Sequence, residues 1–92
     1  MIVEGEKYLG RKLKEWVKEL GGQSIKLEPL HFTGLPDWLV LLPGGRVIFI
    51  ELKTTGDKPR LIQLKIHDKF RALGFRVEVI DNTKKLKEVL EC

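Results

Sequence analysis

The sequence is nearly free of cysteine and has no long apolar run. The only cysteine, Cys92, is the last residue, so neither an internal disulfide nor a cysteine-based metal site can form. No stretch approaches the roughly 20 apolar residues that a membrane-spanning helix needs. The first three residues are apolar, but Glu4 and Glu6 follow at once, which is unlike a secretory signal. We therefore expect a cytoplasmic protein that does not enter a membrane.

The composition is that of a folded protein rather than a disordered one. Hydrophobic residues make up 42% and charged residues 33% of the 92 residues, which is usual for a globular chain. This length is enough for one domain with a modest core, so we expect residues 1–92 to form a single domain. The net charge of +4 favours an anionic partner such as nucleic acid.

The spacing of apolar residues predicts an α/β fold with a central mixed sheet flanked by helices. The turn Pro43-Gly44-Gly45 makes the strands on either side of it an antiparallel hairpin. A helix follows, and the strand after that helix should run parallel to the strand before it, by a right-handed crossover. Thr83 is the predicted cap of a short final helix. The predicted elements are a helix at 4–20, strands at 23–28, 38–42 and 46–53, a helix at 60–73, a strand at 75–80 and the final helix.

Three polar residues lie at the ends of otherwise apolar strands. Asp37 precedes one strand of the hairpin, and Glu51 and Lys53 end the other, so the hairpin brings all three to one edge. Glu51 and Lys53 are two residues apart and therefore share a face. Two carboxylates this close repel each other unless a cation lies between them. The alternative is a structural salt bridge between Lys53 and one of the two acids.

A hard divalent cation with oxygen ligands suits this trio. Mg²⁺ usually takes one or two carboxylates and keeps several waters, which leaves room for phosphate oxygens. A lysine beside it can hold a phosphate oxygen or the attacking water. These are the groups needed to hydrolyse a phosphodiester.

These residues also carry a family resemblance. The segment from Gly34 to Asp37 and the segment from Glu51 to Lys53, with fourteen residues from Asp37 to Glu51, resemble the PD-(D/E)XK nuclease pattern. More narrowly, the chain resembles the small stand-alone virus-type replication-repair nuclease (VRR-NUC) domains of phages and bacteria. The other matching stretches are Glu6–Leu9, Gly21–Gly22, Leu42–Gly45, Lys58–Arg60 with Gln63, and Gly74–Val77.

The resemblance implies a restriction-endonuclease-like αβββαβ core followed by a short C-terminal helix. It also implies roles for individual residues. Asp37, Glu51 and the backbone carbonyl of Leu52 would bind Mg²⁺ or Mn²⁺, and Lys53 would be the catalytic lysine. Gln63 would face the active site from the second long helix. A glutamate of the first helix would point to the same site, and either Glu6 or Glu4 fits, with Glu6 in the better register.

Several basic residues are candidates for substrate binding. Lys7, Arg11, Lys14 and Lys18 form a stripe on the first helix, which is either a phosphate-binding face or an ordinary solvated face. The other candidates are Lys58, Arg60 and His67. His67 lies one turn beyond Gln63, where we expect it to contact DNA; the alternative is an ordinary surface histidine.

The resulting hypothesis is a Mg²⁺-dependent, structure-selective DNA endonuclease that acts in DNA repair. Nothing resembles a zinc finger or helix-turn-helix, so backbone contacts and DNA shape would select the site. By resemblance and size, we expect a homodimer that resolves Holliday junctions. The alternatives are a restriction-like, nicking or flap nuclease without junction preference, and a non-catalytic nucleic-acid-binding domain.

Overall fold

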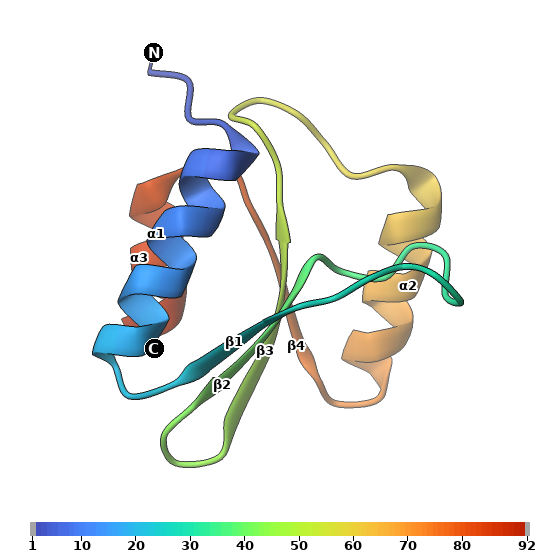
Figure 1. Ribbon diagram of the computed structural model, residues 1–92. Coiled ribbons are helices and arrows are strands. Elements are labelled where there is room, and N and C mark those ends of the chain that lie inside the picture. The colour runs from blue at the N-terminus through green and yellow to red at the C-terminus, as the bar shows by residue number, and fades with distance from the viewer. Residues whose placement is uncertain (1, 92) are drawn as a thin grey trace.

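The computed structural model describes residues 2–91 (Figure 1). Within these residues, three helices and four strands follow one another in the predicted order, with three consecutive strands after the first helix. The helix bounds are α1 (Glu6–Glu19), α2 (Leu61–Ala72) and α3 (Thr83–Glu91). The strand bounds are β1 (Gln23–Lys26), β2 (Trp38–Leu42), β3 (Arg46–Leu52) and β4 (Arg76–Ile80).

The four strands form one mixed sheet in the order β1-β2-β3-β4. β1 with β2, and β2 with β3, pair antiparallel, whereas β3 and β4 pair parallel. The predicted hairpin, the parallel last strand and the α/β class are thereby confirmed. Within the hairpin, Trp38 is opposite Ile50, so Asp37, which precedes β2, lies beside the end of β3.

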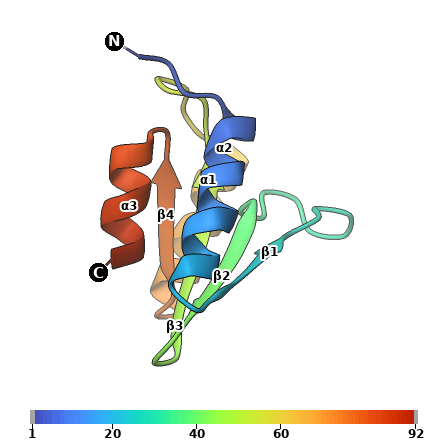
Figure 2. The ribbon, with the colours of Figure 1, turned by 60° about the vertical axis from the view of Figure 1, so that its left-hand side comes forward.

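The helices cover the two faces of the sheet unequally. α1 and α3 pack together on one face, while α2 lies on the other (Figures 1 and 2). The main core fills the space between the sheet and the helices α1 and α3. The core side chains are Leu9, Leu13 and Val17 of α1, Trp38, Val40, Leu42, Ile48, Ile50, Leu52 and Ile80 of the sheet, and Leu86, Val89 and Leu90 of α3.

None of the helices in residues 2–91 is both long enough and apolar enough to span a bilayer.

The inward face of α2 combines polar and apolar residues, and the apolar periodicity of the helix predicts only the apolar ones. Gln63 and His67 are its buried residues, while Ile66 and Phe70 are half-buried and Phe70 packs on Phe49 of β3, with ring centres 5.0 Å apart. The apolar positions are only partly covered: Ile62 is 38% exposed and Leu73 is 66% exposed. The physical reason is that α2 lies over the end of β3, where the buried carboxylate of Glu51 needs polar neighbours.

The predicted cap of α3 is wrong by one residue. Asn82 caps the helix, because its side-chain oxygen accepts a hydrogen bond from the backbone N–H of Lys85 at 2.8 Å. Thr83 is the first helical residue, and it contacts the chain's N-terminal segment. Its backbone N–H and its hydroxyl donate to the two carboxylate oxygens of Glu4, each at 2.8 Å.

Candidate active site

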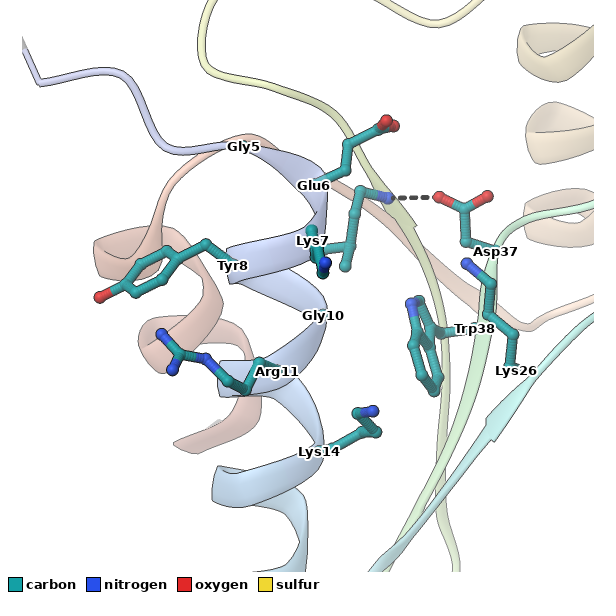
Figure 3. A pocket seen from close by; sticks show the side chains of 11 residues that line it. Gly5, Glu6, Lys7, Tyr8, Gly10, Arg11, Lys14, Lys26, Asp37 and Trp38 are labelled. Atoms are coloured by element: carbon teal, nitrogen blue, oxygen red, sulfur yellow. Dashed lines mark hydrogen bonds between the residues drawn. The ribbon is translucent and has the colours of Figure 1, made fainter.

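Adjacent strands hold the two central carboxylates at one edge of the sheet. Asp37 immediately precedes β2, and Glu51 is the second-last residue of β3. The Oδ2 atom of Asp37 accepts a hydrogen bond from the backbone N–H of Leu52 at 3.0 Å, drawn as the dashed line in Figure 3. This bond ties Asp37 to the neighbouring strand, so the separation of the two acids is set by the backbone rather than by flexible side chains.

Glu51 is almost completely buried, and its two oxygens have different surroundings. The side chain is 1% exposed. Its Oε2 accepts a hydrogen bond from Nε2 of Gln63 at 3.0 Å and lies 3.5 Å from Nζ of Lys53. Its Oε1 has no hydrogen-bond partner among the described residues and lies 3.8 Å from Nε2 of His67. The protein therefore holds one oxygen by a hydrogen bond and a nearby ammonium group, whereas the other oxygen is buried without a hydrogen bond from residues 2–91.

The ionisation of Glu51 reflects this burial. Desolvation, followed by repulsion from Asp37, raises the pKa of Glu51 to about 7, although Lys53 opposes the shift. The carboxylate is thus poorly compensated by the protein's own charges at neutral pH. A bound cation would supply the missing positive charge.

Gln63 is fixed so that it donates to the carboxylate. Its Oε1 accepts a hydrogen bond from the backbone N–H of Arg60 at 2.8 Å. Because a backbone N–H can only donate, the amide oxygen must face Arg60, and the NH₂ group then faces Glu51. The structure places Gln63 beside the site, on the side on which the resemblance expected it.

His67 lies behind Glu51 and is 0% exposed. The prediction that it contacts DNA is therefore wrong, because solvent cannot reach it. Burial, with a smaller effect of Arg71, lowers the pKa of His67, so the ring is neutral at physiological pH. Neither ring nitrogen has a hydrogen-bond partner among residues 2–91.

The structure separates the two candidate glutamates of the N-terminal segment. Both oxygens of Glu4 accept hydrogen bonds from Thr83 at the start of α3. Glu6 is exposed and lines the same cleft as Asp37. In Figure 3 its carboxylate lies on the side of α1 that faces Asp37. By position, Glu6 is the helix carboxylate available to the site.

A cleft of about 840 Å³ opens beside these acids, between α1 and the adjoining ends of β1 and β2. Lys7, Arg11 and Lys14 of the predicted basic stripe line it, but Lys18 does not. Sequence reasoning missed Lys26, which is brought there because it pairs with Trp38 across β1 and β2. The full lining is Gly5, Glu6, Lys7, Tyr8, Gly10, Arg11, Lys14, Lys26, Asp37, Trp38 and Leu52.

The remaining basic candidates lie elsewhere. Lys58 and Arg60 are exposed in the segment that leads into α2, and neither lines the cleft. The backbone of Arg60 contacts Gln63. The structure therefore divides the predicted substrate-binding residues into two groups rather than one surface.

The donor set fits a hard divalent cation and not a histidine-rich or cysteine-rich metal site. Residues 2–91 contain no cluster of three or more His, Cys, Asp or Glu side chains of the kind that forms a metal cage. Two carboxylates with a backbone carbonyl are the sparse oxygen set that Mg²⁺ uses when it keeps several waters. Such a cation would bind the buried, unpartnered Oε1 of Glu51 and would bring the raised pKa of Glu51 down again, because it would stabilise the ionised carboxylate.

The fold and the position of these residues define a restriction-endonuclease-like domain of the PD-(D/E)XK type. No family model matches the chain. Over 77 residues it is 39% identical to "Putative nuclease p44" of Acyrthosiphon pisum secondary endosymbiont phage 1, which covers 84% of this chain and 83% of that protein. A solved structure described as a VRR_NUC domain has a TM-score of 0.86 and 36% identity, and covers 94% of both chains. The chain belongs to the VRR-NUC family.

Proposed function

We propose that this protein is a Mg²⁺- or Mn²⁺-dependent DNA endonuclease that hydrolyses phosphodiester bonds, acting as a single domain in the cytoplasm. The observation that carries this proposal is the state of Glu51. A buried carboxylate with one unpartnered oxygen, beside Asp37 and Lys53, is unfavourable for folding alone. It is favourable where a divalent cation and a phosphate bind.

The metal would be held by Asp37, Glu51 and the backbone carbonyl of Leu52. When bound, it would polarise the phosphodiester and lower the pKa of a bound water. The hydrogen bond from Leu52 N–H to Asp37 leaves the other oxygen of Asp37 for the metal. Gln63 keeps Oε2 of Glu51 in place, so that Oε1 is the free ligand atom. Such outer partners commonly change metal affinity or activity 10- to 100-fold.

Lys53 is the catalytic lysine in this proposal. Its Nζ lies 3.5 Å from Oε2 of Glu51, and its side chain is 16% exposed, so it is near the metal site and still reaches solvent. An ammonium group there can hold a phosphate oxygen, orient the attacking water and stabilise the charge of the transition state. Glu6 lines the same cleft as Asp37. In this proposal it accepts a proton, or a hydrogen bond from a water molecule, at the metal site.

The substrate we propose is branched DNA, cut by a homodimer of the Holliday-junction-resolving type. A dimer has two active sites for two strands. It would also cover apolar side chains that are exposed on and beside α2. These are Leu30 (80% exposed), Phe32 (43%), Leu61 (79%), Leu64 (40%), Leu73 (66%) and Phe75 (47%).

A panel of labelled substrates tests this proposal. Four-way junction, flap and plain duplex DNA are incubated with the wild type and Lys53→Ala in Mg²⁺ and in Mn²⁺. We expect junction cleavage that Lys53→Ala reduces at least about 100-fold. Cleaved duplex beside intact junction would favour the restriction-like or nicking alternative. Binding of all three without cleavage would favour a non-catalytic DNA-binding domain.

A further inference from the structure

The cleft beside the active site contains four cations that lack acidic partners. Lys7, Arg11 and Lys14 of α1 and Lys26 of β1 line it, and none of them forms a salt bridge within residues 2–91. The two acids of the lining, Glu6 and Asp37, lie together at the end next to the active site. The rest of the cleft is therefore positively charged and has no internal counter-charge.

Two of the cations flank the apolar floor of the cleft, the Trp38 ring. Nζ of Lys26 lies 5.1 Å from the centre of the Trp38 ring. Figure 3 shows Lys14 approaching the same ring from α1, whereas Arg11 points away from Trp38 toward Tyr8, where its guanidinium is 5.2 Å from the ring centre. Clustered cations beside an exposed aromatic ring are the combination that binds single-stranded nucleic acid, since phosphates contact the cations and a base contacts the ring. Tyr8, at 39% exposed, offers such a ring, whereas Trp38, at 7%, forms the floor between the cations.

The dimensions favour one strand over a duplex. Lys7 and Lys14 are seven residues apart, nearly two helical turns, so they lie on one face about 10 Å apart along the axis. That length allows neighbouring phosphates of one strand to contact both cations. A cleft of about 840 Å³ has the volume of a small-molecule pocket. A volume of this size is small beside a DNA duplex, so the cleft suits a single strand.

We propose that this cleft binds the backbone of an unpaired DNA strand next to the scissile phosphate, with Lys14 and Lys26 as its main contacts and Trp38 as its floor. This inference rests on the proposed nuclease function, which it deepens by defining the strand that enters the protein. It requires that DNA near the cut be open, as it is at a branch point.

Binding in EDTA tests the cleft separately from cleavage. Fluorescence anisotropy with a labelled eight-nucleotide thymidine oligomer and with a short duplex compares the wild type, Lys14→Glu and Lys26→Glu. Lys84→Glu is the matched control, because Lys84 is exposed on α3 and outside the cleft. We expect each cleft variant to bind the oligomer about tenfold more weakly and to lose about one unit of salt-dependence slope. The control and the duplex should change less than about threefold.

Tryptophan fluorescence tests where the oligomer lies. The chain has two tryptophans, and Trp16 lines a separate hollow with Lys87 and Glu91. In Trp16→Phe, emission reports Trp38 alone, and we expect the oligomer to quench it. Circular dichroism establishes that each variant is folded.

Three results would overturn the proposal: equal losses in cleft and control variants, equal losses for the oligomer and the duplex, or unchanged Trp38 emission at saturation. The proposed function fails separately. If the wild type binds the oligomer as described but cuts no DNA, the proposed strand-binding cleft is supported and the proposed nuclease activity is refuted. If the wild type cuts DNA and the cleft variants bind the oligomer normally, only the proposed strand-binding role of the cleft is refuted.

Discussion

Replacing Glu51 with glutamine should stabilise the metal-free protein at pH 8 and have little effect at pH 5. An unfolded glutamate ionises near pH 4.5, whereas burial and Asp37 raise the pKa of Glu51 to about 7 in the folded protein. Between these values the folded state holds a proton that the unfolded state has released. Stability that is complete below about pH 4.5 is therefore lost as the pH rises through about 7.

The size of this loss follows from the shift. A pKa raised from 4.5 to about 7, at 1.36 kcal/mol per unit, corresponds to a loss of about 3 kcal/mol in the free energy of unfolding. Glutamine removes the charge and keeps the shape. Its oxygen can still accept from Gln63, and its uncharged NH₂ would take the place of Oε1, which lies 3.8 Å from Nε2 of the neutral His67.

Urea unfolding in EDTA at pH 5 and pH 8 measures this effect for the wild type, Glu51→Gln and an exposed control, Glu88→Gln. We expect the stability difference between Glu51→Gln and the wild type to grow by about 2–3 kcal/mol over this range, with no such change for the control. Mg²⁺ should raise the wild-type stability at pH 8 and leave Glu51→Gln unchanged. A difference that does not vary with pH would refute the argument that Glu51 is an uncompensated buried acid.

Three further predictions concern neighbouring residues. Gln63→Leu should lower Mg²⁺ affinity or the cleavage rate about 10- to 100-fold because it frees Oε2 of Glu51, and a Mg²⁺ titration of cleavage checks this. Glu6→Gln should impair cleavage more than Glu4→Gln, while Glu4→Gln should lower the free energy of unfolding by about 1 kcal/mol through its lost bonds to α3; the reverse order would reassign the helix carboxylate. Gly34→Ala should destabilise the fold by at least about 1–3 kcal/mol in thermal unfolding, because φ is +86° and the added Cβ would lie 2.8 Å from a backbone oxygen; an unchanged melting temperature would contradict the observed loop packing.

The position of the acidic pair could be predicted from sequence because strand geometry is regular. A tight turn between two apolar runs fixes a hairpin, and a hairpin brings the start of one strand to the end of the next. Asp37 and Glu51 therefore had to be neighbours. The parallel fourth strand follows equally from the intervening helix.

The surroundings of the pair could not be predicted in the same way. Apolar periodicity assigns the inward face of a helix to its hydrophobic residues. On α2 this holds only in part: Ile66 and Phe70 are half-buried, but the buried positions are Gln63 and His67, beside the carboxylate of Glu51. The role of Lys26 depends on strand register, which its four-residue strand does not specify. The separation of Glu4 from Glu6 depends on a contact with Thr83, far along the chain.

The rate of junction cleavage as a function of Mg²⁺ concentration, measured for the wild type and Asp37→Asn, tests whether a cation bound by Asp37 is needed for cleavage. We predict no cleavage in EDTA, a saturable rise with Mg²⁺ for the wild type, and a loss of at least about 100-fold in Asp37→Asn. Cleavage that persists in EDTA, or equal rates for the two proteins, would contradict it.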